Sequence, residues 1–127
     1  MHMNNKTLYE DAIKHWGQEL QIGMFHEEIA ELIKAINKYR RSHNLLDHLN
    51  IIKELADVKV MTEQIQVMFD ISDASIDSQY DLKIKKFESM LINSKEVLAH
   101  EKEKDRKIPR KIPHPKAGKA IKKRTKI

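Results

Sequence analysis

Apolar residues recur every three or four positions along most of the first hundred residues, which is the spacing of one face of an α-helix. No stretch alternates between apolar and polar residues as a half-buried strand does, and Gly and Pro number only 3 each. The pattern predicts an all-α fold with four helices. They are expected from about residue 7, over about 22–40, over about 49–69, and from about 76 to 91 or 98.

Each predicted helix carries one apolar stripe that is expected to face the core. Thr7 and Glu10 have the spacing of a capping box at the first helix. Gly17 is a weak point in that helix, and Asn44 or Asp47 is available to cap the third helix. The stripes are Leu8, Ala12, Trp16 and Leu20; Phe25, Ile29, Leu32 and Ile36; Ile51, Leu55, Val58, Thr62, Ile65 and Phe69; and Ile76, Tyr80, Ile84, Phe87 and Leu91.

Charge divides the chain into an acidic body and a basic tail. Residues 100–127 hold 12 Lys and Arg against 3 Asp and Glu, whereas residues 1–99 hold 12 against 16. All three prolines lie in the tail, which has few large apolar residues. This composition argues against a packed fold there. We therefore expect one helical domain over 1–99 and a flexible basic tail over 100–127.

The composition also excludes several classes of protein. The chain has no Cys, which excludes a disulfide framework and a thiolate metal site and fits a reducing cytoplasm. No apolar run approaches the roughly 20 residues that a membrane span needs. The first ten residues lack the apolar core of a signal peptide. A cytoplasmic location without membrane contact is the expectation.

Four carboxylates flank the stripes of the second and third helices. At about 100° per residue, Glu28 and Glu31 lie about 60° and 120° to one side of their stripe. Glu54 and Asp57 lie at about the same two angles, in the same sense, on the third helix. A short connection favours antiparallel packing of the two helices. If the stripes pack together, all four carboxylates come to one side of the pair.

Converging carboxylates repel one another unless their pKa values rise or a cation binds. An oxygen-only ligand set suits Mg²⁺ or Mn²⁺ rather than zinc. The alternative is that these are ordinary solvated charges. A di-iron site is disfavoured, because its Glu-x-x-His pattern occurs nowhere in the chain.

The stretch "HWGQELQIGMFHEEIAELIKAINKYRR", followed by "NIIKELADVKVMTEQIQVMFD", resembles the MazG-like nucleoside triphosphate pyrophosphohydrolases of the all-α NTP pyrophosphohydrolase superfamily. The family signature is E-E-x-x-E, a spacer, then E-x-x-D. It is matched here by Glu27, Glu28, Glu31, Glu54 and Asp57. The likeness covers about residues 8–92, including "YDLKIKKFESML", and the flanks of the signature look like those of the compact phage and bacterial members.

The resemblance implies hydrolysis of an NTP or dNTP to the monophosphate and pyrophosphate, as house-cleaning of the nucleotide pool. It implies Mg²⁺, or Mn²⁺, on Glu28, Glu31, Glu54 and Asp57. Glu27 is left as a further ligand or as the catalytic base. One residue departs from the pattern: family members often have a second acidic residue where this chain has Lys53. Lys53 alters the local charge balance or reaches a phosphate.

Other residues are candidates for holding the substrate. Trp16 and Gln21 are candidates for the base pocket, with core packing as the alternative for Trp16. The candidates for binding the phosphates are Lys34, Lys38, Lys83 and Lys86. The alternative is that these lysines are simply solvated.

The resemblance also implies a homodimer or homotetramer. A second stripe on the third helix, Met61, Gln64 and Met68, is a candidate interface, with intramolecular packing as its alternative. The basic tail is a candidate for weak, non-specific nucleic-acid binding through phosphate contacts, or only for solubility. The rival to the enzyme is a non-catalytic helical oligomer that binds nucleic acid or a protein partner through this tail.

Overall fold

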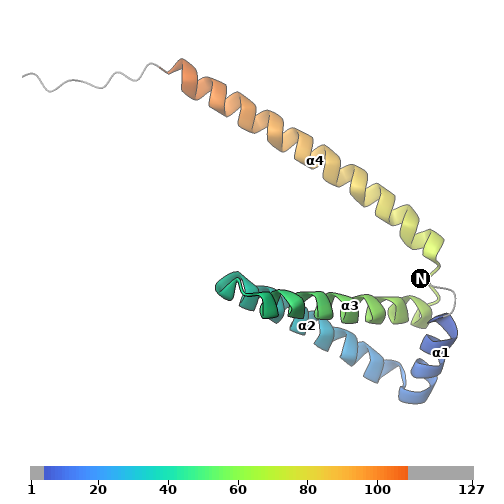
Figure 1. Ribbon diagram of the computed structural model, residues 1–127. Helices are drawn as coiled ribbons and strands as arrows, with labels where there is room; N and C mark the ends of the chain where they lie inside the picture. Colours follow the sequence, from blue (N-terminus) through green and yellow to red (C-terminus); the bar gives the residue numbers. More distant parts are fainter. Residues whose placement is uncertain (1–4, 109–127) are drawn as a thin grey trace, which may run out of the picture. The chain divides into compact units, whose positions relative to one another are not determined.

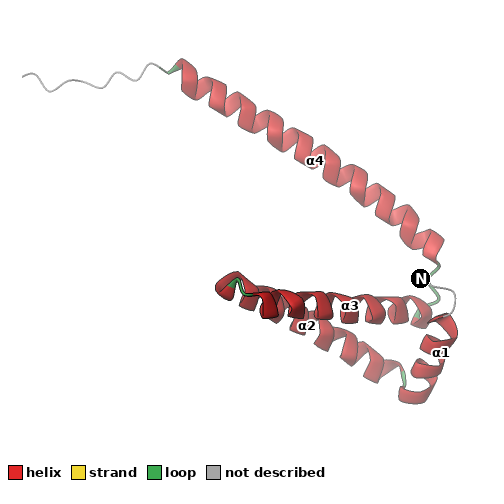
Figure 2. Cartoon of the chain, viewed as in Figure 1, coloured by secondary structure: helices red, strands yellow, loops and turns green. Residues whose placement is uncertain are grey.

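The computed structural model describes residues 5–108, and this part of the chain is helical throughout apart from short turns (Figures 1 and 2). The helices are α1 (Asn5–Trp16), α2 (Gln18–Ser42), α3 (Leu45–Met68) and α4 (Asp73–Lys107). The described residues contain no strand. The predicted all-α class with four helices is confirmed. No helix among these residues has both the length and the apolar character that crossing a membrane requires.

Gly17 separates α1 from α2. Its φ of +86° lies in the region that favours glycine. Its backbone N–H still donates to the Ile13 carbonyl at 2.8 Å, and its own carbonyl accepts from the Gln21 N–H at 3.2 Å. The predicted weak point is therefore a break, and α2 begins earlier than expected. The predicted capping box is wrong, because α1 already includes Asn5 and Thr7 lies inside its first turn.

Two residues, His43 and Asn44, connect α2 to α3. His43 has a φ of +51° and its N–H donates to the Tyr39 carbonyl at 2.8 Å, which ends α2. The Asn44 side chain accepts from the Asp47 N–H at 2.8 Å, so Asn44 is the cap predicted for the third helix. This tight turn makes α2 and α3 antiparallel, and they lie side by side (Figure 1).

Most of the fully buried residues of α2 and α3 are polar. On α3 the most buried residues are Asp47, Glu54, Met61 and Gln64, and on α2 they are Gln21 and Ala35. Several of them follow a spacing of seven residues, which is two helical turns. We call this line of buried residues the α2–α3 seam. It accounts for most of the fully buried positions in residues 5–108, Tyr9 of α1 being the exception.

The predicted core stripes do not form this seam. Leu55 is 51% exposed and Phe69 is 56% exposed, and Ile36 is exposed as well. At about 100° per residue, the seam is turned about 60–70° from the stripes on both helices, toward the carboxylates. The sequence therefore predicted the wrong face of each helix as the buried one. The apolar stripes of α2 and α3 are left half-buried or exposed on the single chain.

The fourth helix, α4, is longer than predicted. It continues through residues 100–107, which the sequence assigned to the tail, because none of those residues breaks a helix before Pro109. None of its residues is buried. The boundary between two compact units falls inside this helix, at Lys83/Ile84. The rest of the predicted tail lies outside the described residues.

Candidate functional site

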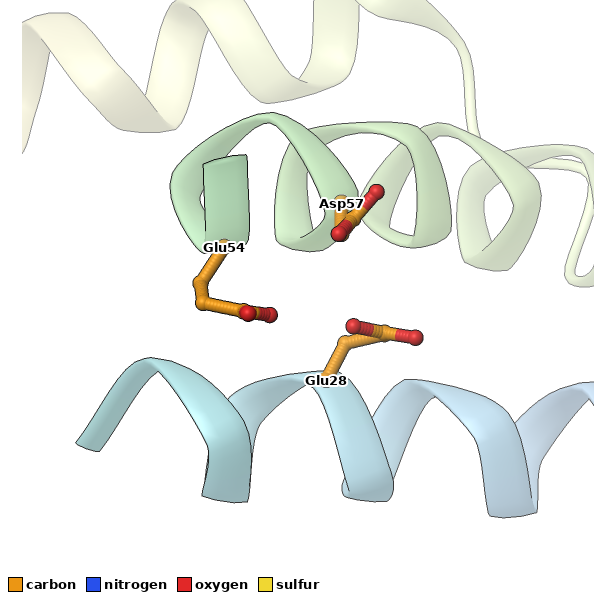
Figure 3. A group of neighbouring side chains, drawn as sticks. All are labelled: Glu28, Glu54 and Asp57. Carbon is orange, nitrogen blue, oxygen red and sulfur yellow. The ribbon is translucent and has the colours of Figure 1, made fainter. Parts of the chain in front are cut away.

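Three of the four predicted metal ligands come together between two helices. Glu28 projects from α2, and Glu54 and Asp57 project from α3 toward it (Figure 3). One carboxylate oxygen from each lies within 4.8 Å of the others. Glu28 meets the α3 pair because the two-residue turn brings the helices back antiparallel. Glu54 and Asp57 share a face because they lie three residues apart.

Burial makes this cluster electrostatically costly. Glu54 is buried at 4% exposure, and Glu28 and Asp57 are half-buried. Burial raises the pKa of Glu28 above its ordinary 4.5, and the negative charges of Asp57, Glu54 and Glu27 raise it further. The ammonium of Lys53 acts in the opposite direction. The site thus favours the binding of positive charge.

Lys53 supplies one positive charge to the cluster. Its Nζ lies 3.1 Å from Glu54 Oε1 and 3.6 Å from Asp57 Oδ2. The hydrogen bond and charge of Glu54, followed by the charge of Asp57, raise the pKa of Lys53 above its ordinary 10.5. The sequence marked this residue as unusual but did not predict an ion pair with its immediate neighbour, because adjacent helix positions rarely face each other.

The donor set fits a hard divalent cation. Carboxylate oxygens are the ligands that Mg²⁺ and Mn²⁺ prefer, and none of the three clustered groups is a nitrogen or sulfur donor. Mg²⁺ usually takes only one or two protein carboxylates and keeps waters and substrate phosphates as its other ligands. Three convergent carboxylates are sufficient for that mode of binding.

Glu31 and Glu27 lie outside the group of three. Glu31 pairs with Lys34 of its own helix, with Oε1 and Nζ 3.6 Å apart. Glu27 is exposed, and its charge contributes to the raised pKa of Glu28. The structure therefore brings together three of the four predicted ligands, and Glu27 is placed next to them by its adjacency to Glu28.

Two of the predicted phosphate-binding lysines pair with carboxylates outside the group of three. Lys34 is paired with Glu31, and Lys38 lies 3.2 Å from the buried carboxylate of Asp47. Asp47 also accepts from Ser42 Oγ at 2.5 Å. These partners hold the pKa of Asp47 below its ordinary range, Ser42 having the largest effect. Lys38 thus has a structural role at the turn. Lys83 and Lys86 are exposed on α4.

The two predicted base-binding residues differ in burial. Trp16 is 56% exposed at the end of α1 and packs edge-on against His15, with ring centroids 5.3 Å apart. Core packing, the alternative for Trp16, is thus not what the single chain shows. Gln21 is 1% exposed, and its Nε2 lies 3.7 Å from the sulfur of Met24.

Gln64 of α3 is buried as Gln21 is, although the sequence made it a candidate for a protomer interface. Gln64 is 8% exposed, its Nε2 lies 3.7 Å from Met61 Sδ, and its buried Oε1 has no hydrogen-bond partner among the described residues. Met61 is 4% exposed. For Met61 and Gln64 the structure shows the alternative, packing within the chain, because both are buried in the α2–α3 seam. Their seven-residue spacing with Glu54 and Asp57 was the available signal.

Comparisons of this chain with protein-family models, with curated proteins and with solved structures found no match.

Proposed function

We propose that this protein is a divalent-cation-dependent nucleoside triphosphate pyrophosphohydrolase of the MazG-like type. The reaction is NTP + H₂O → NMP + pyrophosphate, with dNTPs as equal candidates. Water forms a bond to the α-phosphorus, and the bond from that phosphorus to the oxygen of the leaving pyrophosphate breaks. The observation that carries the proposal is the convergence of the Glu28, Glu54 and Asp57 carboxylates between α2 and α3.

The charge of the site supports a polyanionic substrate held through cations. A triphosphate would be repelled by three bare carboxylates. Mg²⁺ or Mn²⁺, when bound, supplies the charge that joins phosphate to carboxylate and lowers the pKa of a water molecule. Glu28, Glu54 and Asp57 hold that charge in place, and Glu31 is a further ligand in the proposal. Glu27 is assigned as an additional ligand or as the base that accepts the proton of the attacking water.

Basic and aromatic groups complete the proposed substrate site. Lys83 and Lys86 are the proposed partners of the phosphates and of the departing pyrophosphate. Lys34 serves the same purpose once it leaves Glu31. The indole of Trp16, which is 56% exposed, is the proposed stacking surface for a base. The amide of Gln21 has the donor and acceptor to read a base edge, and because it is 1% exposed it has to be uncovered for that role.

Self-association is part of the proposal, and a second copy of the chain is the proposed occupant of the apolar face of α4. Six large side chains fall within about 80° of one another around this helix. None of them is buried, and Phe87, the most exposed, is at 64%. A helix without a packed face is only marginally stable in water. We call this set the α4 face: Ile76, Tyr80, Ile84, Phe87, Leu91 and Leu98.

The length of the α4 face supports pairing with a like helix. Within it, Tyr80, Ile84, Phe87, Leu91 and Leu98 keep the alternating three- and four-residue steps of a coiled-coil seam, with Ser94 at the one polar position. Closed symmetric dimers and tetramers are the common outcome of such self-complementary surfaces. The absence of cysteine supports a cytoplasmic location as part of the same proposal.

The second candidate function is a non-catalytic helical oligomer that binds nucleic acid or a protein partner through its basic tail. The observation that favours it is the Lys53 ion pair, since an ammonium already offsets charge at Glu54 and Asp57. This candidate does not need the three carboxylates, whereas the enzyme does not need the basic tail, residues 100–127.

The test is to incubate the full chain with a panel of NTPs and dNTPs, in Mg²⁺ and then in EDTA, and to separate the products. Monophosphate plus pyrophosphate, formed only with the cation, is the expected result. Diphosphate plus orthophosphate would contradict the proposed mechanism. The absence of turnover with Mg²⁺ and with Mn²⁺ would favour the binding protein, whose tail would then be tested by its salt-dependent binding to DNA.

A further inference from the structure

Lys53 places a positive charge at the solvent edge of the carboxylate cluster. Its ammonium lies 3.1 Å from Glu54 Oε1 and 3.6 Å from Asp57 Oδ2. These are two of the three side chains that converge on a single point. The ammonium of Lys53 is therefore already paired with two of the carboxylates that we assign as ligands of a divalent cation.

The two ends of this ion pair differ in their surroundings. The Glu54 side chain is 5% exposed, and a buried carboxylate needs a counter-charge because burial removes it from water. The Lys53 side chain is 68% exposed on a flexible four-carbon stem. Moving the ammonium away thus disturbs little packing, but it leaves Glu54 in need of another cation.

A divalent cation would compete with the lysine. Two positive groups cannot both lie against the Glu54 and Asp57 carboxylates without repelling each other. The displaced ammonium then needs an anionic partner, and the phosphates of a bound polyphosphate are the anions that such a site would bring closest. Binding of the cation and of the polyphosphate thereby become coupled through one side chain.

We propose that Lys53 is an internal counter-ion that competes with the divalent cation for Glu54 and Asp57, and that it moves to a phosphate of the substrate when the cation binds. The inference rests on the proposed metal site. Its consequence is weak cation binding to the free protein and tighter binding in the presence of a polyphosphate. Because such coupling is reciprocal, the cation strengthens polyphosphate binding by the same factor.

The test measures Mn²⁺ affinity rather than turnover. Mn²⁺ is titrated into the full-length wild-type protein and its Lys53→Met variant, and free Mn²⁺ is followed by electron paramagnetic resonance. Without nucleotide, Lys53→Met is expected to bind Mn²⁺ about tenfold more tightly, within the usual range of coupling between sites. Lys53→Arg keeps the charge and should bind as the wild type does. Lys59→Met is the matched control, since Lys59 is also an exposed lysine of α3 but forms no ion pair with the cluster.

A second titration includes a triphosphate analogue with a methylene bridge between the α- and β-phosphorus atoms, which cannot be cleaved there. The analogue should tighten Mn²⁺ binding to the wild-type protein by more than it tightens binding to Lys53→Met. The proposal is overturned if Lys53→Met and wild type bind Mn²⁺ equally in both titrations.

A further variant separates this inference from the proposed function. Glu54→Gln should lose Mn²⁺ binding if the cluster holds the cation. If the wild type, Lys53→Met and Glu54→Gln all fail to bind Mn²⁺, the metal site itself is wrong and the role of Lys53 fails with it. If Glu54→Gln loses binding while Lys53→Met matches the wild type, the site stands and only the role of Lys53 is overturned. Circular dichroism verifies that each variant is folded.

Discussion

Glu28 of α2 and Asp57 of α3 face each other across the helix pair with carboxylate oxygens no more than 4.8 Å apart (Figure 3). The negative charge of Asp57 raises the affinity of Glu28 for a proton, and the two carboxylates together attract cations. For Glu28 the effect adds to that of burial, and its pKa is raised above 4.5. The pair therefore destabilises the cation-free protein, and it increases the affinity of the site for a cation.

The first prediction concerns the pH dependence of stability in EDTA. A carboxyl group whose pKa is higher in the folded state binds more protons when folded, so its contribution to stability is lost as pH rises above the unfolded value of about 4.5. Glu28→Gln should match the wild type in acid and exceed its free energy of unfolding near pH 7. Urea denaturation at a series of pH values measures this.

Asp47 provides the opposite control in the same experiment. Its pKa is lowered in the folded state, so its contribution is present above about 3.8 and is lost as the pH falls. Asp47→Asn should therefore be less stable than the wild type near neutral pH and should approach it in acid. A Glu28→Gln variant that loses stability at pH 7 would contradict the account of the cluster.

The second prediction concerns the link between α1 and α3. Tyr9 is 4% exposed, and its hydroxyl donates to Glu63 Oε2 at 2.7 Å. Tyr9→Phe removes this charge-assisted hydrogen bond and should lower the free energy of unfolding by about 1.5–3 kcal/mol. Tyr39→Phe is the control, because the Tyr39 hydroxyl has no hydrogen-bond partner among the described residues, and it should change stability little. Urea denaturation compares the two variants, and equal effects would mean that the bond contributes nothing.

The raised pKa of Tyr9 also predicts that the protein loses stability at alkaline pH. Burial, followed by the hydrogen bond and charge of Glu63, raises the pKa of Tyr9 from 10.0 to about 12. The folded state thus holds the phenol proton more tightly, and stability should fall as the pH rises above 10. Tyr9→Phe should lack this part of the alkaline loss. An identical alkaline profile in both proteins would contradict the assignment.

The third prediction uses two glycines that differ in backbone conformation. Gly17 has a φ of +86°, whereas Gly23 lies inside α2, and an added Cβ would meet nothing within 4 Å at either position. Gly17→Ala should destabilise the protein by about 1–3 kcal/mol, because φ +86° with ψ +156° is a conformation that essentially only glycine adopts. Gly23→Ala should stabilise it by about 0.5–1 kcal/mol through helix propensity. Thermal melts that show the same sign for both would contradict the break at Gly17.

The fourth prediction tests the α4 face. Phe87→Glu places a charge in the middle of the apolar stripe and should shift the protein to a smaller species in multi-angle light scattering after size-exclusion chromatography. Ser89→Glu puts the same charge about 180° away around the helix from the centre of the stripe and should leave the mass unchanged. A monomeric wild type at micromolar concentration would contradict self-association.

The periodicity of the sequence predicted the helices well but placed their packed face incorrectly. A 3.6-residue period shows which residues share a face, and it does not show which neighbour that face meets. Ile36 and Leu55 belong to regular apolar stripes, yet the single chain buries Ala35 and Glu54 beside them. The end of the fourth helix was also predicted incorrectly. The sequence placed it at residue 91 or 98, but α4 continues to Lys107 because no residue before that point breaks a helix.

The candidate site was more predictable than the core. Glu28, Glu54 and Asp57 lie on the same side of their stripes, and the short turn at His43 and Asn44 makes the helices antiparallel, so they meet. The partners of Lys53 were not predictable, because its reach to the adjacent Glu54 depends on side-chain conformation rather than on helical spacing. The ion pair between Glu31 and Lys34 depends on side-chain conformation in the same way.

If these carboxylates hold the cation that a triphosphate needs, pyrophosphate release from the preferred nucleotide at saturating Mg²⁺ depends on Glu54. Glu54→Gln is compared with the wild type and with Glu88→Gln, an exposed glutamate of α4. We predict that Glu54→Gln loses about 100-fold or more of the rate while staying folded, and that Glu88→Gln keeps it. A Glu54→Gln protein that releases pyrophosphate at the wild-type rate would contradict the account.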